Sequence, residues 1–245
     1  MKRFITILLL IPFIGYSQTC IVAIKHNDTI MVGADSRASQ SGVNLLTGEK
    51  ISRSADTSCK IISNSTGDIN FSLSGYDGIG LRNLAKQIID TAKSISSFEL
   101  SYEQMAMSHI LKRINNVSDL EKQYLFSTFT IGYIVSDAVV FGRINGALFL
   151  HYLAIVRAPS DSLKMTFQMG RNDTLSHAVI GEWEEIYRDK LFSNRDVWKN
   201  GLSNGIEYLI NYSSKYHPEF VGGPINILMV TKRKTIWIGK KPPCY

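Results

Sequence analysis

The segment from Thr19 to Ser39 constrains the fold of this chain more than any other stretch. Apolar residues dominate positions 20–24 and 30–34, on either side of a polar turn at 26–28. Two short apolar runs separated by a polar turn predict a β-hairpin whose strands are largely buried. The second of these strands ends at Asp35, so the hairpin presents an acidic side chain at its edge.

The first 18 residues have the three parts of a secretory signal peptide. Lys2 and Arg3 form a positive start, residues 4–14 form an apolar core, and Gly15-Tyr16-Ser17 is a small-x-small cleavage signal. The apolar core is too short to span a bilayer. We therefore expect an exported protein, secreted or periplasmic, with no membrane association once the leader is removed.

The exact cleavage point decides which residue begins the mature chain. The small-x-small rule places the cut after Ser17, which leaves Gln18 ahead of Thr19. Exposure of Thr19 needs a cut one residue later, or loss of Gln18 by self-cleavage or by an aminopeptidase. The leader is therefore 1–18, or 1–17 followed by a one-residue propeptide.

Composition predicts that residues 19–245 form one globular domain. The chain is 44% hydrophobic and 20% charged, which is ordinary for a folded soluble protein. No repeat, low-complexity tract or Pro/Gly linker divides it. The net charge of +6 includes Lys2 and Arg3 of the leader, and no run of basic residues has the length of a nucleic-acid-binding stripe.

The order of predicted elements favours an α+β fold. Strands and helices come in blocks rather than in alternation, which argues against a parallel α/β sheet. Two packed sheets with a pair of helices on each outer face satisfy this order. The predicted strands are 19–26, 29–35, 60–62, 69–73, 126–135, 147–158, 163–169, 176–180, 224–232 and 235–239, the predicted helices are 78–94, 102–115, 182–192 and 195–216, and 38–56 is predicted to be a loop.

Three motifs and this element order resemble the catalytic β-subunits of proteasomes, which are N-terminal nucleophile (Ntn) hydrolases. The motifs are Thr19 with Ala34-Asp35-Ser36-Arg37-Ala38-Ser39, then Ser72-Leu73-Ser74-Gly75, then Val221-Gly222-Gly223-Pro224-Ile225-Asn226. The resemblance covers nearly all of the chain after the leader. It implies a four-layer αββα sandwich that cleaves peptide or other amide bonds.

The resemblance assigns a role to five residues. Thr19 is the nucleophile, and Asp35 follows it by sixteen residues, as in the family. Lys60 opens the third strand, further along the chain than in the family because the polar 38–56 segment is longer. Gly75 supplies an oxyanion-hole N–H, and Arg37 braces the loop after Asp35.

Each residue type suits this chemistry. A threonine hydroxyl can attack an acyl carbon when its own α-amino group, directly or through water, serves as the base. A free α-amine has a pKa near ~8, so it accepts a proton at neutral pH more readily than a lysine side chain. A lysine beside the hydroxyl lowers the hydroxyl pKa, and an aspartate fixes the lysine in place.

The chain departs from the family at three positions near the nucleophile. Glu182 stands where the family has a serine. Pro218 and Val221 stand where the family has an aspartate and a second serine that orient the threonine amine. Glu182 and Glu219 are candidates to replace that pair, and without it the rate, self-processing or activity itself is in question.

Two other hydrolases and one non-enzymatic role stay open. Loss of Thr19 would make Cys20 the first residue, as in Ntn acylases of the bile-salt or penicillin hydrolase type. An amidase acting on small molecules is a further alternative. A catalytically silent relative would instead be a binding or scaffold module, and a homo-oligomer is left open in every case.

Cysteine and histidine usage gives no cofactor or metal prediction. Cys20, Cys59 and Cys244 are odd in number, and although export allows a disulfide, no pairing follows from the sequence. The five histidines have no HExxH or paired spacing, and no phosphate-binding glycine motif is present. We therefore expect no metal and no cofactor.

Overall fold

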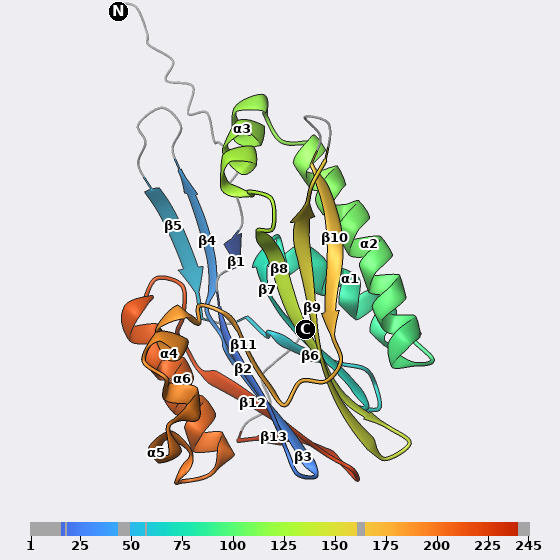
Figure 1. Cartoon of the computed structure of the whole chain (residues 1–245), viewed down its shortest axis with the longest axis vertical. Helices are drawn as coiled ribbons and strands as arrows, with labels where there is room; N and C mark the ends of the chain where they lie inside the picture. The colour runs from blue at the N-terminus through green and yellow to red at the C-terminus, as the bar shows by residue number, and fades with distance from the viewer. Residues whose placement is uncertain (1–15, 18, 44–49, 57, 161–164, 240–245) are drawn as a thin grey trace, which may run out of the picture.

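The computed structural model describes residues 16–17, 19–43, 50–56, 58–160 and 165–239. Two antiparallel sheets pack face to face, and helices cover the outer face of each sheet (Figure 1). The layers run helix, sheet, sheet, helix across the molecule. The predicted α+β, four-layer αββα sandwich is therefore confirmed.

The first sheet has six strands within the described residues. Its order is β1-β7-β8-β9-β10, and β6 pairs with β7 beside β1. All of its pairs are antiparallel. The strands are β1 (Tyr16–Ser17), β6 (Ile61–Ser63), β7 (Ile69–Tyr76), β8 (Ile134–Ile144), β9 (Ala147–Ala158) and β10 (Thr166–Asn172).

The second sheet contains the N-terminal hairpin. Its order in the described residues is β11-β2-β3-β12-β13, again antiparallel throughout. The predicted hairpin is confirmed, with Ile21 opposite Ala34 in the register. The strands are β2 (Cys20–His26), β3 (Thr29–Asp35), β11 (His177–Gly181), β12 (Ile225–Thr231) and β13 (Thr235–Ile238).

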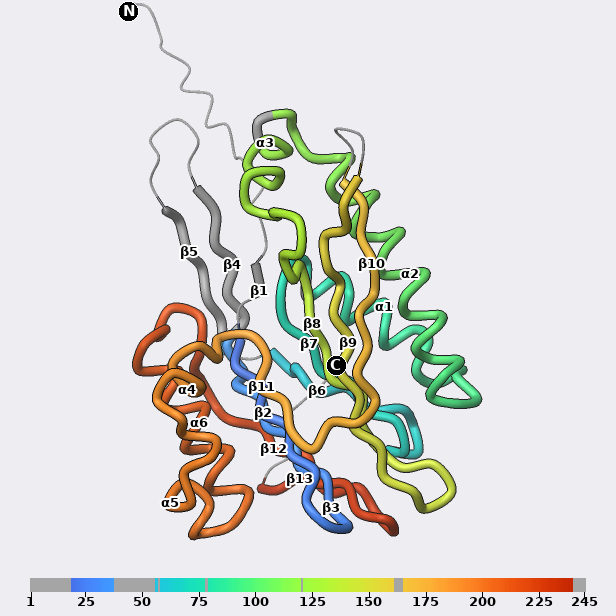
Figure 2. Tube along the Cα trace, viewed as in Figure 1, coloured from blue at the N-terminus to red at the C-terminus, as the bar shows by residue number. Residues whose placement is uncertain are grey.

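Helices on the two outer faces enclose two of the three apolar cores. On the first sheet lie α1 (Gly78–Ile89) and α2 (Ile95–Asn115), and α1 buries Leu81, Ala85 and Ile89 at helical spacing. On the second sheet lie α4 (Glu184–Arg188), α5 (Arg195–Trp198) and α6 (Leu202–Tyr216). A third core fills the space between the sheets, and the trace in Figure 2 shows the helices α1 and α2 on one side and α4 to α6 on the other.

Two of the predicted elements are wrong. The segment predicted as the 38–56 loop contains a separate hairpin, β4 (Ala38–Val43) with β5 (Lys50–Ala55). These strands pair with each other by backbone hydrogen bonds and need no apolar period, which is the signal that predicts a strand. The segment predicted as a strand at 126–135 begins with the end of α3 (Asp119–Thr128), continues as a turn, and enters β8 only at Ile134.

The helix errors have identifiable causes. Leu125 and Phe129 are fully buried and four residues apart, which is helical spacing that the sequence analysis assigned to a strand. The predicted helices at 182–192 and 195–216 are interrupted by a 3-10 turn at Leu191–Ser193 and by Gly201, whose φ is +97°. Among the described helices, none has the length and apolar character needed to cross a membrane.

Candidate active site

The fold brings Thr19, Asp35 and Lys60 into contact in the interior. Thr19 directly precedes β2, Asp35 ends β3, and Lys60 directly precedes β6. Thr19 and Asp35 are fully buried, and Lys60 is 1% exposed. The β2–β3 register sets the first two side by side, and Lys60 reaches them from the edge of the other sheet.

These three side chains share one hydrogen-bond network. The Lys60 ammonium donates to Thr19 Oγ1, and the Thr19 hydroxyl donates to Asp35 Oδ1. Lys60 Nζ also lies 3.1 Å from Asp35 Oδ1 and 3.2 Å from Oδ2. The threonine oxygen is thus held between a cation and a carboxylate, the environment that favours a reactive hydroxyl.

Backbone donors hold the Asp35 carboxylate in position. Oδ1 accepts a bond of 3.0 Å from the Cys20 N–H, and Oδ2 accepts bonds of 3.1 Å from the N–H groups of Arg37 and Gly222. Charge-assisted bonds of this kind offset the cost of removing a carboxylate from water. Gly222 comes from the glycine pair before β12, so the third family-like motif contacts the site through its backbone.

Burial changes the pKa of the Lys60 side chain. Desolvation lowers the pKa of Lys60 to about 8, while the neighbouring Asp35 opposes that change and the Arg82 guanidinium adds to it. Arg82 donates to Ser58 Oγ at 2.9 Å and to the Cys59 carbonyl at 3.1 Å, directly ahead of Lys60. Lys60 therefore carries its charge below a pH of about 8 and loses it above that pH.

Gly75 lies where residues 16–17 pair with β7 of the first sheet. Its φ is +107°, and a Cβ there would lie 2.6 Å from both Ser136 Cα and the Val135 carbonyl oxygen, so only glycine fits. Ser17 is opposite Gly75 in the β1–β7 pair. The backbone just ahead of Thr19 thus lies as an added antiparallel strand along the segment that carries Gly75.

A second backbone contact reaches Thr19 from β11. The Thr19 carbonyl accepts a 2.7 Å bond from the Glu182 N–H. Gly181 has a φ of +86°, and a Cβ there would lie 1.8 Å from that carbonyl oxygen. The sequence analysis noted Glu182 as a departure and did not identify Gly181, whose requirement is visible only from the close approach of the two strands.

Arg37 lies in the loops around Asp35, together with Pro218 and Val221, two of the three positions that depart from the family pattern. The Arg37 side chain binds both carboxylate oxygens of Asp56, at 2.6 and 3.0 Å, and donates to the Pro218 carbonyl. Val221 is fully buried, and its carbonyl accepts a 2.9 Å bond from Ser214. Neither Pro218 nor Val221 brings a polar side chain to Thr19.

The cysteines separate into two states. Cys20 is free and fully buried, and burial raises the pKa of its thiol, which disfavours the reactive thiolate. Cys59 is disulfide-bonded. Since Cys20 is free, the partner of Cys59 lies outside the described residues.

One cluster in the described part of the chain has the composition of a metal site. Glu99, His151 and Asp173 place their ligand atoms within 4.8 Å of one another. His151 Nδ1 lies 2.7 Å from Glu99 Oε1, and the Arg171 guanidinium lies 3.8 Å from the other Glu99 oxygen. Arg171 already supplies a positive charge here, so the arrangement is accounted for by ion pairing.

No family model matches the chain, and no curated protein matches it. A solved structure described as "Thiobacillus denitrificans BPH in complex with Epoxomicin" is 13% identical, with 87% of this chain and 98% of that chain covered and a TM-score of 0.48. The site described above therefore stands on its own geometry.

Proposed function

We propose that the mature protein is an exported threonine-type Ntn hydrolase that cleaves peptide or other amide bonds, with Thr19 as its first residue. The observation that carries the proposal is the direct contact of the Thr19 hydroxyl with both Lys60 and Asp35. Removing a lysine and an aspartate from water to surround one threonine hydroxyl costs free energy of folding. Buried charged groups of this kind are typical of functional sites.

The proposed reaction has two steps. Thr19 Oγ1 attacks the substrate carbonyl carbon while the free α-amino group accepts the hydroxyl proton, and this proton then goes to the departing amine as the amide bond breaks. Water then hydrolyses the resulting ester on Thr19: the same α-amine accepts a proton from the water molecule as its oxygen bonds to the acyl carbon. The bond from that carbon to Thr19 Oγ1 breaks, the acid departs, and the proton returns from the amine to Oγ1. Lys60 stabilises the developing alkoxide, and the Gly75 N–H is the proposed donor to the oxyanion.

The path of the leader supports a peptide as substrate. Residues 16–17 lie antiparallel to the end of β7, opposite Tyr76 and Gly75. A peptide added to the same edge would gain main-chain hydrogen bonds and approach Thr19 from the direction that the leader follows. A panel of extended peptides and small amides separates peptidase from small-molecule amidase.

Export is supported by two independent features. The first is the leader itself, with its basic start, apolar core and small-x-small signal. The second is the disulfide at Cys59, because such bonds persist mainly in oxidising compartments. We propose a secreted or periplasmic location on these grounds.

Reaction with a two-point electrophile tests the proposed function. A peptide α′,β′-epoxyketone offers a ketone to the hydroxyl and an epoxide to a neighbouring free amine, so full reaction needs both groups on one residue. The wild-type mature protein should gain the mass of one probe on a peptide beginning with Thr19, and Thr19→Ala should gain none. Labelling of both proteins alike would place the reactive group at another residue, and labelling of neither would favour the silent module; either result would refute the assignment of Thr19.

A further inference from the structure

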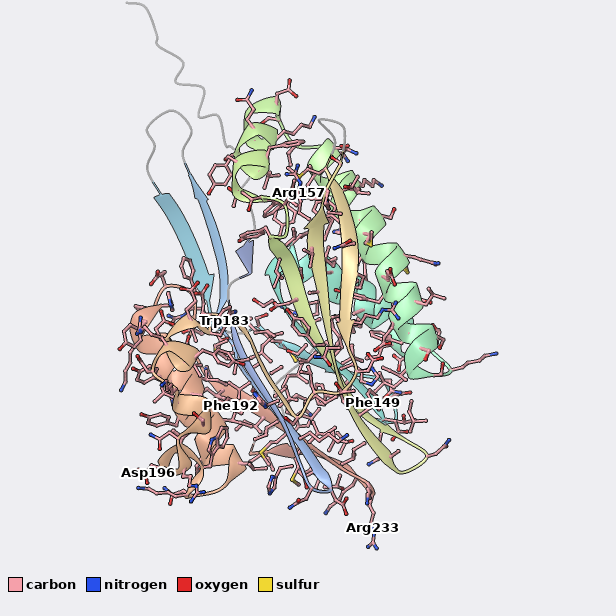
Figure 3. The ribbon with its side chains drawn as sticks, in the orientation of Figure 1. Phe149, Arg157, Trp183, Phe192, Asp196 and Arg233 are labelled. Atoms are coloured by element: carbon pink, nitrogen blue, oxygen red, sulfur yellow. The ribbon has the colours of Figure 1, made fainter. Side chains whose placement is uncertain are left out.

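The end of β11 holds Glu182 directly beside Thr19. The Glu182 N–H donates to the Thr19 carbonyl at 2.7 Å, and Ser213 Oγ on α6 donates to the Glu182 carbonyl at 2.8 Å. Gly181 permits this approach because it has no Cβ to collide with the Thr19 carbonyl oxygen. Figure 3 shows the neighbouring Trp183 at this end of the helix layer.

The Glu182 side chain belongs to a cluster of three titratable groups. Its Oε2 lies 3.6 Å from His217 Nε2, and the same nitrogen lies 2.8 Å from Glu185 Oε1. The side chains of Glu182 and Glu185 are only 16% and 8% exposed. Glu185 Oε2 is buried and has no hydrogen-bond partner among the described residues, so the cluster has unused capacity to accept a donor.

The charges of this Glu182–His217–Glu185 cluster are unbalanced. Two carboxylates face a single imidazole, so the cluster is negative even when His217 is protonated. Burial raises the pKa of Glu182, and the His217 side chain opposes that change. Other acidic groups act on Glu182 in the same direction as burial, namely Glu185, Glu184 and Glu219, and the phenol of Tyr133 lies within the field of Glu182 from the loop before β8.

His217 connects this cluster to the Asp35 side of the site. Its carbonyl accepts a 2.8 Å bond from the Val221 N–H, and the next residue, Gly222, donates to Asp35 Oδ2 at 3.1 Å. One short loop after α6 therefore positions both the carboxylate that contacts the Thr19 hydroxyl and the imidazole that contacts Glu182.

Cleavage of the chain before Thr19 creates a free α-amino group near Glu182. The α-amino group has up to three N–H donors and, when protonated, the positive charge that the cluster lacks. It is attached to the same Cα as the carbonyl that Glu182 already binds, so it forms within the immediate surroundings of Glu182. Lys60 lies on the hydroxyl side of Thr19 and cannot serve as an acceptor for the amine.

We propose that Glu182 accepts a hydrogen bond from the α-amino group of mature Thr19, and that His217 and Glu185 hold Glu182 in place for it. Glu182 is then a positioning residue, which directs the amine lone pair toward the Thr19 hydroxyl. It fills the role left open by Pro218 and Val221. This inference rests on the proposed function, because it requires a chain that begins at Thr19.

The ionisation of the Thr19 amine tests the inference without any substrate. Mature protein labelled with ¹⁵N-threonine gives the α-amine pKa by NMR titration. A nearby carboxylate stabilises the ammonium, so Glu182→Gln should lower the pKa of the amine by about 1. The matched control Glu207→Gln makes the same change at an exposed position on α6 and should leave the amine pKa at its wild-type value.

Steady-state kinetics of Glu182→Gln give a second measurement, whose pH profile would not shift if Glu182 had only a structural role. In Glu182→Gln we expect kcat to fall about 10- to 100-fold with little change in KM. The acidic limb of the profile of kcat/KM against pH should move to lower pH, because the pKa of the Thr19 α-amine is lowered. If Glu182→Gln does not fold, Glu185→Gln leaves Glu182 in place and should move the amine pKa in the same direction by less.

Two results have different meanings. An α-amine pKa equal to the wild-type value in both Glu182→Gln and Glu185→Gln would overturn the inference while leaving the proposed function intact. A mature chain that does not begin at Thr19 would instead refute the proposed function before the amine could be measured.

Discussion

Lys60 donates a hydrogen bond to the hydroxyl of Thr19 across 41 residues of sequence and from the opposite sheet. The contact exists because the hairpin of the second sheet and the edge strand of the first sheet end at the same place. The site thus depends on how the two sheets are packed. Its residues can be tested one at a time.

Removal of the Lys60 charge should reduce both the activity and the folding stability of the protein. We expect Lys60→Met to reduce kcat/KM at least ~100-fold, because the developing alkoxide loses its cation. The variant should also lose about 3 kcal/mol of folding stability, since Asp35 stays buried without its partner. The double variant Asp35→Asn/Lys60→Met should recover stability in denaturant titrations but no activity, and a recovery of activity would contradict the role of Lys60.

Activity should decline at alkaline pH as Lys60 loses its proton. Burial lowers the pKa of Lys60 to about 8, so the side chain is charged below that pH and neutral above it. A cation is needed beside the Thr19 alkoxide, and kcat/KM should therefore fall above a pH of about 8. A profile that stays flat to pH 10 would show that the charge of Lys60 is not required.

Gly75→Ala should lose stability for a steric reason. The added Cβ would lie 2.6 Å from Ser136 Cα, and alanine is strained at the glycine φ of +107°. Gly146→Ala is the matched control, because Gly146 also has a positive φ, +77°, but has open space around it. We expect Gly146→Ala to lose about 1 kcal/mol in thermal unfolding and Gly75→Ala to lose clearly more. Equal losses would mean that Gly75 has no special packing role.

Asp137 should make the protein less stable as the pH rises. It lies opposite Ser74 in the β7–β8 pair, and burial raises its pKa from 3.8 to about 7. The folded state then binds more protons than the unfolded state between these values, so stability falls as the pH rises from about 4 to 7. Asp137→Asn should remove this dependence and be more stable at pH 8, by on the order of 2 kcal/mol. Glu207→Gln, an exposed change on α6, should retain the wild-type dependence.

The disulfide of Cys59 can be identified by peptide mapping. Cys20 is buried and free, and Cys244 is the remaining cysteine of the sequence. A non-reducing digest should therefore link the Cys59 peptide to the C-terminal peptide and leave Cys20 unmodified until the protein unfolds. A link that includes Cys20 would contradict the structure of the site.

Much of the fold could be predicted because its signals are local. The apolar period of β2 and β3 is visible in the sequence, and so is the helical spacing of Leu81 and Ile89, which α1 buries. The β4–β5 hairpin has no apolar alternation, and α3 carries aromatic residues that resemble a strand. In the first case the pairing of the two strands with each other decided the outcome, and in the second the packing of Leu125 and Phe129 into the core of the first sheet did so, rather than local preference.

The candidate site could be predicted only in part for a related reason. Thr19, Asp35, Lys60 and Gly75 stand at strand ends, so spacing and motif were enough to propose them, and their catalytic roles stay predictions. Gly181 and the His217–Glu185 pair could not be found in this way. Gly181 is needed because two strands approach within contact distance, and the pair forms only when α6 ends beside α4.

The most direct test of the account is the N-terminus of the mature exported protein, by intact mass and N-terminal sequencing. We predict a chain that begins at Thr19, which supplies the free amine that the mechanism needs. A chain that begins at Gln18 or retains the leader would block that amine and contradict the proposed function. A chain that begins at Cys20 would also contradict it and would make the cysteine the nucleophile.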